Sequence, residues 1–233
     1  MSTKILPVHQ DMATSRLQTL LYESAKRTLD VILASIGIIV CGPLLAVIAL
    51  LIKLDSPGPI LYRGLRTGRF GVPFQMLKFR SMVADAERRG GSCTSDEDPR
   101  ITSIGRFLRK TKLDELPQMF NVLHGSMSFV GPRPEVKKFT ELFTEEERCI
   151  LDVRPGITDR ASMWDSDEGV RLSGKPDPEE AYLTMIRPTK ISLELEYVRT
   201  RSFSTDLLIL FQTIWMVLQR ILFQKIKLRA PLA

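Results

Sequence analysis

The chain has 233 residues, 44% of them hydrophobic, and a formal net charge of +6. This composition excludes a disordered chain and leaves enough apolar side chains for one large domain or two small ones. The positive charge predicts an anionic partner, which could be nucleic acid, an acidic lipid surface or a phosphorylated substrate. The three cysteines have no metal-ligand spacing, which predicts reduced thiols in a cytosol-facing protein and no zinc site.

Residues 1–28 are predicted to form a frayed tail followed by an amphipathic helix. Leu17, Leu20, Leu21 and Ser24 recur at helical spacing, with basic residues at other positions. This pattern is typical of a helix that lies at a membrane surface, here as the lead-in to a more apolar segment.

Residues 31–52 contain no charged side chain and are long enough for about 33 Å of straight helix. Gly42 and Pro43 lie in the middle of this run, and an interior proline should kink or break the helix. Cations flank the run on both sides, so the positive-inside rule gives no clear direction. We therefore predict a re-entrant membrane helix over residues 29–54, with both ends cytoplasmic. A kinked single span and a buried core helix are the alternatives.

Residues 55–233 are predicted to form a cytosolic catalytic domain that begins with a short β-hairpin. Glycine and proline separate short apolar segments over residues 56–82. Lys78 and Arg80 are two apart in the second strand and should face the same side, where they could bind an anion. Residues 84–100 are charged and poor in large apolar side chains, which predicts a mobile loop or a short linker.

An acidic pair, Asp114 and Glu115, follows a run of cations. Pro117 favours a helix that starts near Asp114, and Gly125 should end it. Acidic side chains in a first helical turn often do no more than interact with the helix dipole.

The same pair would have a chemical role if cations surround it. A carboxylate that approaches a pyrophosphate is repelled, and magnesium and arginine are the usual means of offsetting that repulsion. The cations that the predicted arrangement brings near the acidic pair are Lys78, Arg80, Arg109, Arg133 and Arg154.

The last apolar segment, residues 207–219, carries no charge and is followed by Arg220, Lys225, Lys227 and Arg229. It fits an interfacial helix whose cations meet anionic lipid, and it fits a closing core helix equally well.

The ordered motifs LKFRSM, IGRFLRKTKLDELPQMFNVLHGSMSFVGPRPE and RPGIT, after one apolar segment, resemble the bacterial sugar transferases. These are polyprenyl-phosphate phosphoglycosyl transferases of the monotopic type. The resemblance covers roughly residues 26–202 and implies an α+β, mostly helical protein without the extra transmembrane helices of larger members. It implies transfer of a sugar phosphate from a nucleotide diphosphate sugar, with UDP expected, to undecaprenyl phosphate. This reaction starts assembly of an exopolysaccharide, O-antigen, capsule or glycoprotein glycan at the cytoplasmic face of the bacterial inner membrane.

The resemblance also implies roles for matching residues. Asp114 would be the nucleophile that carries the phosphosugar and would hold Mg²⁺, with Glu115 as its acidic partner. Pro43 would break the re-entrant helix. The matching cations around the phosphates are Lys78, Arg109 and Arg133. After RPGIT many members continue with glycine and an Ala-Gln-Val type segment, whereas this chain reads DRASMWDSDEG, a departure that bears on nucleotide or sugar preference.

Two other classes stay open at this point. A non-catalytic membrane-bound adaptor of glycan assembly would need no metal. A nucleic-acid-binding protein is disfavoured, because aromatic residues make up 7% of the chain and are not interleaved with the cations as stacking platforms require. The oligomeric state is not determined by the sequence, and a homodimer is compatible with it.

Overall fold

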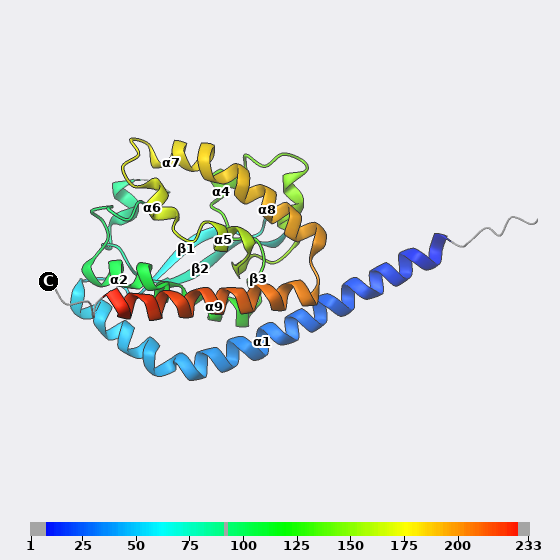
Figure 1. The fold of residues 1–233 in the computed structure, drawn as a ribbon, viewed down its shortest axis with the longest axis horizontal. Helices are drawn as coiled ribbons and strands as arrows, with labels where there is room; N and C mark the ends of the chain where they lie inside the picture. Colours follow the sequence, from blue (N-terminus) through cyan, green and yellow to red (C-terminus); the bar gives the residue numbers. More distant parts are fainter. Residues whose placement is uncertain (1–7, 91–92, 228–233) are drawn as a thin grey trace, which may run out of the picture.

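The computed structural model describes residues 8–90 and 93–227, with side chains described from residue 18 to residue 219 apart from residue 87. The chain begins with α1 (Val8–Asp55), a helix of 48 residues. The helix continues through Pro43, and Figure 1 shows that it changes direction along its length without ending. An interior proline bends a helix by removing one backbone hydrogen bond. The structure therefore has one bent helix where the sequence led us to expect a lead-in helix and a helix interrupted at Pro43.

α1 is long and apolar enough to cross a membrane, and only 11% of its most apolar window is buried. Its C-terminal half nevertheless packs against the domain, where Ile48 and Ile52 are buried with Phe79 and Leu108. One side of α1 thus closes a core cluster, while the other side exposes large apolar side chains.

The predicted β-hairpin is confirmed. β1 (Leu61–Thr67) and β2 (Pro73–Phe79) pair in antiparallel fashion, joined by the 3₁₀ turn η1 (Arg69–Gly71). Leu61 lies opposite Phe79 in the register. The following segment has irregular backbone with one 3₁₀ turn, η2 (Ala86–Arg89).

The helix predicted to start near Asp114 begins later. α2 (Ser103–Thr111) ends where Lys112 adopts a left-handed conformation, with φ of 58° and ψ of 14°. The chain then forms the 3₁₀ turn η3 (Leu113–Glu115) before α3 (Gln118–His124), which Gly125 ends as expected, at φ of 96°. Both carboxylates therefore lie in a tight turn ahead of the helix.

The remaining elements complete the domain. β3 and β4 form a short parallel pair, and η5 is a π-helical turn leading into α8. The bounds are β3 (Ser128–Val130), α4 (Lys137–Thr140), η4 (Glu147–Asp152), β4 (Gly156–Thr158), α5 (Arg160–Trp164), α6 (Glu168–Leu172), α7 (Pro178–Ala181), η5 (Tyr182–Ile186), α8 (Arg187–Thr200) and α9 (Phe203–Lys227).

α9 has one buried side and one exposed apolar side. Its buried side chains include Ile209 and Asp206, and Asp206 accepts hydrogen bonds from Tyr22 (2.9 Å), Lys26 (2.6 Å) and Tyr197 (2.8 Å). These bonds join α1, α8 and α9. The opposite side of α9 exposes Leu208, Phe211, Ile214, Trp215 and Leu218. The cations predicted at positions 220–229 lie outside the described side chains.

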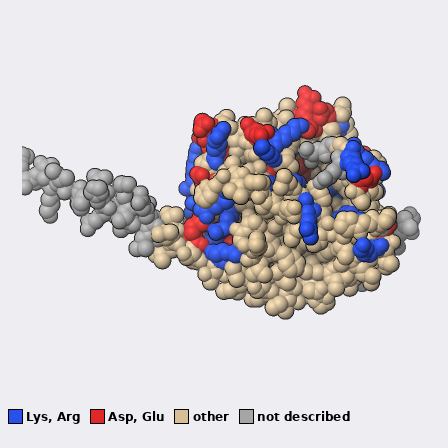
Figure 2. All heavy atoms as spheres, turned by 180° about the vertical axis from the view of Figure 1, so that it is seen from behind, with Lys and Arg blue, Asp and Glu red and all other residues tan. Residues whose placement is uncertain are grey.

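α1 and α9 lie along the same side of the molecule, away from α7 and α8 (Figure 1). In the opposite view, charged side chains gather over the upper part and a broad uncharged surface covers the lower part, where α1 runs (Figure 2). The exposed apolar side chains of these two helices define what we call the apolar face. On α1 they include Ile36, Ile39, Val40, Leu44, Val47 and Leu50.

Candidate active site

Asp114 is buried in the turn η3, with 6% of its surface exposed. The left-handed Lys112 reverses the chain after α2, so that the turn packs against strand β2. Oδ1 of Asp114 has no hydrogen bond partner among the described residues. A buried carboxylate oxygen without a donor is costly unless a ligand completes it. Asp114 is therefore the member of the acidic pair with a carboxylate oxygen available to a ligand.

Glu115 is fully engaged by two cations. Lys78 on β2 donates to Oε1 at 3.0 Å, and Arg133 binds both carboxylate oxygens, with Nη1 3.2 Å from Oε2 and Nη2 on Oε1. A bidentate arginine–carboxylate pair fixes orientation as well as charge. Glu115 therefore holds both cations in place, and the charge of Lys78 acts on Asp114 as well.

The two carboxyl groups have different affinities for a proton. Burial raises the pKa of Asp114, and the positive charge of Lys78 offsets part of that rise. Burial also opposes ionisation of Glu115, but Arg133 and Lys78 outweigh it and hold the pKa of Glu115 well below its usual value. Two adjacent titratable groups pushed in opposite directions are typical of catalytic pairs.

Arg133 is placed by a close backbone crossing between two of the sequence motifs. A Cβ atom on Gly131 would lie 2.5 Å from the carbonyl oxygen of Arg154, and one on Gly156 would lie 2.2 Å from the nitrogen of Gly131. Only glycine permits this approach. Gly156 also donates to the carbonyl of Pro132 at 2.9 Å. The GPRP and RPGIT motifs thus form one unit that presents Arg133 to Glu115.

Gln118 is a buried polar residue that the sequence reasoning did not single out. It is fully buried, and neither its amide oxygen nor its amide nitrogen has a partner among the described residues. It lies four residues after Asp114, so one turn of chain separates the two. The sequence signal for Gln118 is its spacing: it is a polar residue four positions after Asp114, followed by the apolar Met119 and Phe120.

Three predicted cations are placed differently. Arg80 is buried and donates to the carbonyls of Pro57 (2.7 Å) and Ser56 (2.6 Å), so it holds the connection from α1 to β1 and not the acidic pair. Arg109 makes no ion pair with the acidic pair in the described part of the chain, although its charge lowers the pKa of Asp114 against the larger effect of burial. Arg154 binds the carbonyl of Gly125 at 3.2 Å and pairs with Glu23, at the far end of α3.

Of the two carboxylates in the acidic pair, one has an oxygen that could coordinate magnesium. Within the described residues no three His, Cys, Asp or Glu side chains gather as a metal site. Magnesium, however, is commonly held by one or two carboxylates together with substrate phosphates and water. Both oxygens of Glu115 are occupied by cations, whereas Oδ1 of Asp114 is unpartnered. The residues therefore fit a magnesium ion bound through Asp114 and completed by substrate oxygens.

A second polar group consists of Asp159, in the segment that departs from the family pattern, and Glu194 on α8. Asp159 caps α5, with Oδ1 2.6 Å from the nitrogen of Ser162, while its Oδ2 has no partner among the described residues. Glu194 on α8 is 1% exposed, and neither of its carboxylate oxygens has a partner there. Lys190, one turn away, is bound to Glu135. Burial raises the pKa of both Asp159 and Glu194, which favours their neutral forms.

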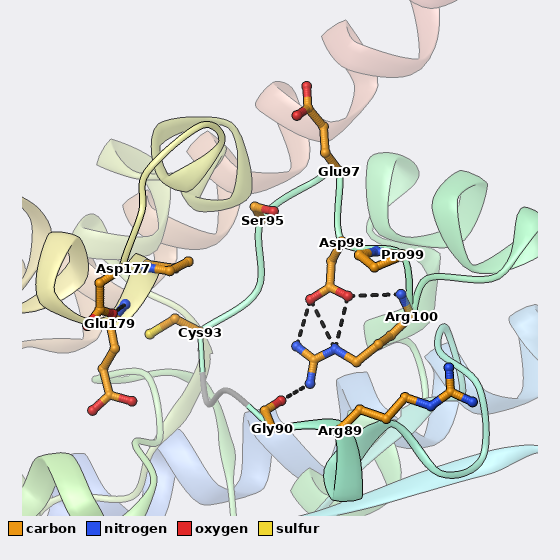
Figure 3. Close-up of a pocket in the computed structure, with 11 residues that line it drawn as sticks. Arg89, Gly90, Cys93, Ser95, Glu97, Asp98, Pro99, Arg100, Asp177 and Glu179 are labelled. Carbon is orange, nitrogen blue, oxygen red and sulfur yellow. Dashed lines mark hydrogen bonds and ion pairs between the residues drawn. The ribbon is translucent and has the colours of Figure 1, made fainter.

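A pocket of about 670 Å³ lies elsewhere, between the segment around residues 89–100 and α7 (Figure 3). An ion pair of Arg100 with Asp98, at 2.6 Å, forms one wall. Burial raises the pKa of the Cys93 thiol in this pocket to about 12, so the thiol is protonated at neutral pH. The pocket shares no lining residue with the group around Asp114.

Comparison with known proteins identifies the sequence pattern. The model of the family "bacterial sugar transferase" matches residues 21–220. A Bacillus subtilis (strain 168) protein, provisionally named an undecaprenyl-phosphate N-acetylgalactosaminyl 1-phosphate transferase, is 43% identical over 160 residues, or 69% of this chain and 86% of the relative. The UDP-N-acetylgalactosamine-undecaprenyl-phosphate N-acetylgalactosaminephosphotransferase of Aeromonas hydrophila is 36% identical, covering 92% of this chain and 48% of the relative.

A third relative is the UDP-glucose:undecaprenyl-phosphate glucose-1-phosphate transferase of Escherichia coli (strain K12), which is 39% identical over 193 residues. The match covers 82% of this chain and 39% of that relative. The chain thus spans most of the first of these relatives and less than half the length of the other two.

Proposed function

This chain belongs to the bacterial sugar transferase family, and we propose that it transfers a sugar 1-phosphate from a UDP-sugar to undecaprenyl phosphate, which initiates a bacterial glycan. The observation that carries the proposal is the buried Asp114, with one free carboxylate oxygen, beside a glutamate clamped by two cations. The names of the relatives support the acceptor, and two of them support a UDP-sugar donor.

The proposed reaction has two displacements at one phosphorus atom. An oxygen of Asp114 attacks the sugar-linked phosphorus, the bond to the bridging oxygen breaks, and UMP leaves with that oxygen. A phosphate oxygen of undecaprenyl phosphate then attacks the same phosphorus and breaks the bond to Asp114. The product is undecaprenyl diphosphate sugar, and the carboxylate is regenerated.

The surrounding side chains explain how a carboxylate approaches a diphosphate. Two like unit charges about 4 Å apart repel by about 4 kcal/mol at an effective dielectric of 20. Lys78, held by Glu115, places positive charge next to Asp114 and favours its ionised form, and Arg133 is held by the same glutamate. Bound magnesium would supply further neutralisation of the phosphates.

A covalent relay suits substrates of such different solubility. The donor arrives from water and the acceptor from the bilayer, so each can bind in turn to one cationic site. The apolar face of α1 and α9 supports attachment to the cytoplasmic side of the inner membrane, and the change of direction along α1 would allow both of its ends to stay on that side (Figure 1).

The topology can be measured by labelling single cysteines at the exposed positions Ser24 and Asp55, in a chain whose native cysteines are replaced. Labelling of both from the cytoplasmic side supports the monotopic arrangement. Labelling from opposite sides would show that α1 spans the bilayer.

The chemistry is tested by intact-protein mass spectrometry. We expect the purified chain, incubated with UDP-N-acetylgalactosamine or UDP-glucose and Mg²⁺ without the lipid acceptor, to gain the mass of a phosphosugar with one of these donors. Asp114→Asn should show no added mass. If trapping finds no adduct while UMP is released only when both substrates are bound, transfer is direct and Asp114 acts as a metal ligand or base.

A non-catalytic adaptor is the alternative function. It predicts no magnesium-dependent release of UMP with any donor in a panel of nucleotide sugars, whereas the proposed enzyme releases UMP with at least one of them.

A further inference from the structure

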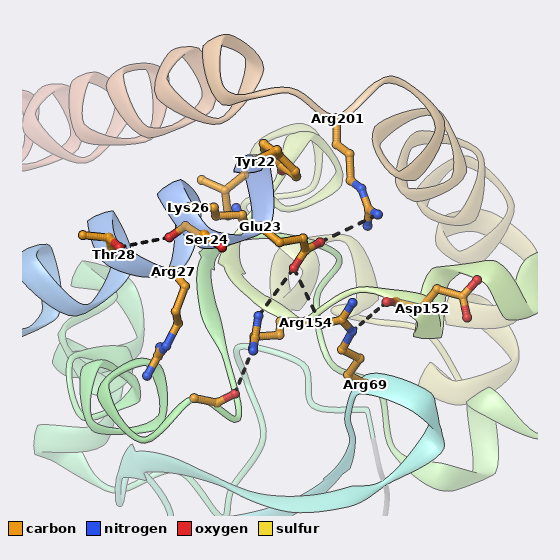
Figure 4. Close-up of polar contacts among 12 residues, drawn as sticks. Tyr22, Glu23, Ser24, Lys26, Arg27, Thr28, Arg69, Asp152, Arg154 and Arg201 are labelled. Atoms are coloured by element: carbon orange, nitrogen blue, oxygen red, sulfur yellow. Dashed lines mark hydrogen bonds and ion pairs between the residues drawn. The ribbon is translucent and has the colours of Figure 1, made fainter. Parts of the chain in front are cut away.

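A second group of charged side chains lies at the opposite end of α3 from Asp114 (Figure 4). Glu23 of α1 faces three arginines that come from separate parts of the chain. Arg69 lies at 3.6 Å, Arg154 at 3.5 Å and Arg201 at 3.7 Å from its carboxylate oxygens. We call these four residues the Glu23 cluster.

The cluster holds more positive charge than its carboxylate neutralises. One glutamate faces three guanidinium groups, and each N–O distance is 3.5 Å or more, beyond the usual range for a charged hydrogen bond. Nη1 of Arg201 is buried without a hydrogen bond partner among the described residues. The cluster therefore has unused donors as well as excess charge.

Two of these arginines are anchored to the backbone through Nε, and not through the terminal nitrogens that face Glu23. Nε of Arg69 donates to the carbonyl of Asp152 at 2.8 Å, and Nε of Arg154 donates to the carbonyl of Gly125 at 3.2 Å. These bonds hold both side chains in place. Their terminal nitrogens point toward Glu23 (Figure 4). The guanidinium groups of Arg69 and Arg154 are therefore held facing Glu23 by hydrogen bonds that do not involve Glu23.

The cluster adjoins the apolar face. Leu20 and Leu21, three and two residues before Glu23 on α1, are 64% and 61% exposed. Phe203, two residues after Arg201, is 40% exposed at the start of α9. Arginines beside exposed apolar side chains are placed where the headgroups of a bilayer would lie if the apolar face meets lipid.

We propose that the Glu23 cluster binds the phosphate of an anionic phospholipid, such as phosphatidylglycerol, with Glu23 as the internal counterion that the lipid phosphate displaces. The inference rests on the membrane attachment given under Proposed function. Guanidinium forks match phosphate oxygens in geometry, and anionic lipids attract cations at the cytoplasmic surface. The lipid would orient the domain without taking part in the transfer.

The test uses the full chain in a neutral detergent and measures binding of dihexanoyl phosphatidylglycerol, with dihexanoyl phosphatidylcholine as the zwitterionic comparison. Arg201→Gln removes the guanidinium group that pairs with Glu23. We expect it to weaken binding of the anionic lipid at least tenfold. Arg199→Gln removes the same charge two residues away, from an exposed pair with Glu146, and should change binding less than twofold.

Glu23→Gln gives the opposite sign. Removing the internal counterion should tighten binding of the anionic lipid severalfold, because the lipid no longer competes with a carboxylate. A cluster that only braces the fold would lose stability in this variant and gain no affinity. Weaker or unchanged binding by Glu23→Gln therefore overturns the proposal, as does equal loss in Arg199→Gln and Arg201→Gln.

Two further measurements identify which lipid binds to the cluster and show whether lipid binding and sugar phosphate transfer are independent. Geranyl phosphate, a short polyprenyl phosphate, should not displace the phosphatidylglycerol from the cluster, and displacement by it at lower concentration would identify the acceptor substrate as the occupant instead. Asp114→Asn should bind the anionic lipid as the unmodified chain does. Arg201→Gln should still form the phosphosugar adduct. Adduct formation without selective binding of the anionic lipid by the unmodified chain would overturn the lipid proposal alone. Lipid binding without an adduct would overturn the proposed reaction alone.

Discussion

The two charged groups at the ends of α3 differ in how their charges are balanced. Around Asp114 and Glu115, two carboxylates face two cations, and the paired side chains are 13% to 25% exposed. In the Glu23 cluster one carboxylate faces three arginines, and the side chains are 22% to 30% exposed. The first group is held by contacts with hydrogen bond geometry, whereas the second is held by longer ion pairs.

The difference follows from the cost of burying charge. An unpaired charge in a poorly solvated site costs several kcal/mol, about 3–5 when one partner of a buried pair is removed. Partly exposed charges are screened, and their pairs contribute about 0–1 kcal/mol. The more buried Glu115 is therefore closely paired, while the Glu23 cluster, with side chains 22% to 30% exposed, can keep excess charge for a ligand.

The largest expected effect is on turnover. Asp114→Asn removes the proposed nucleophile from the neutral group and should reduce the rate of UMP release by about 1,000-fold or more, equivalent to about 4 kcal/mol. Glu23→Gln, at the other end of α3, should change this rate less than about twofold. Retention of a tenth of the activity by Asp114→Asn would show that the carboxylate is not the nucleophile.

The next effect is on stability. Glu115→Gln leaves Lys78 and Arg133 without their shared counterion and should lower the free energy of unfolding by about 3–5 kcal/mol. Glu23→Gln should lower it by about 1 kcal/mol or less. Thermal unfolding of both variants in the same detergent measures the contrast. Equal losses would mean that burial does not distinguish the two groups.

A smaller effect is expected from Arg133→Lys, which keeps the charge and loses the bidentate fork on Glu115. We expect about a tenfold loss of kcat/KM, with Arg133→Ala losing more. Wild-type activity in the lysine variant, together with an inactive alanine variant, would show that only charge is required at this position.

The smallest effect concerns Glu194, a buried carboxylate without a partner among the described residues. Burial raises its pKa well above the usual 4.5, so the folded protein holds this proton more tightly than the unfolded chain does. Stability is then greatest at acidic pH and falls as pH rises through the folded-state pKa. Glu194→Gln cannot ionise and should show a smaller fall in Tm between pH 5 and pH 8. An unchanged pH dependence would mean that the carboxyl group is already ionised at pH 5.

The acidic pair could be found from the sequence because it lies in a short, continuous motif that a whole family shares. DELPQ and GPRP are short motifs of matching spacing, and the hairpin and the end of α3 at Gly125 follow from local backbone preferences. Asp114, Glu115, Lys78 and Arg133 were all predicted as site residues. In the structure Lys78 and Arg133 bind Glu115, which is next to Asp114 in the chain, while Oδ1 of Asp114 has no hydrogen bond partner among the described residues.

Which cations meet the pair could not be predicted in the same way. Lys78 and Arg80 are two apart, as on one face of a strand, yet β2 ends at Phe79 and Arg80 turns to the carbonyls after α1. The backbone of Arg154 takes part in the same crossing that presents Arg133, but its side chain pairs with Glu23. Spacing determines direction within one element and carries no information about which distant element packs against it.

The sequence alone therefore determined the local elements, the apolar character of residues 31–52 and the family to which the motifs point. The tertiary structure decided that α1 continues through Pro43, that Gln118 is fully buried, and that three arginines converge on Glu23. The physical reason is that these outcomes depend on contacts between residues far apart in the chain, such as Glu23 with Arg201, whose energies are set by packing and burial and by no local pattern.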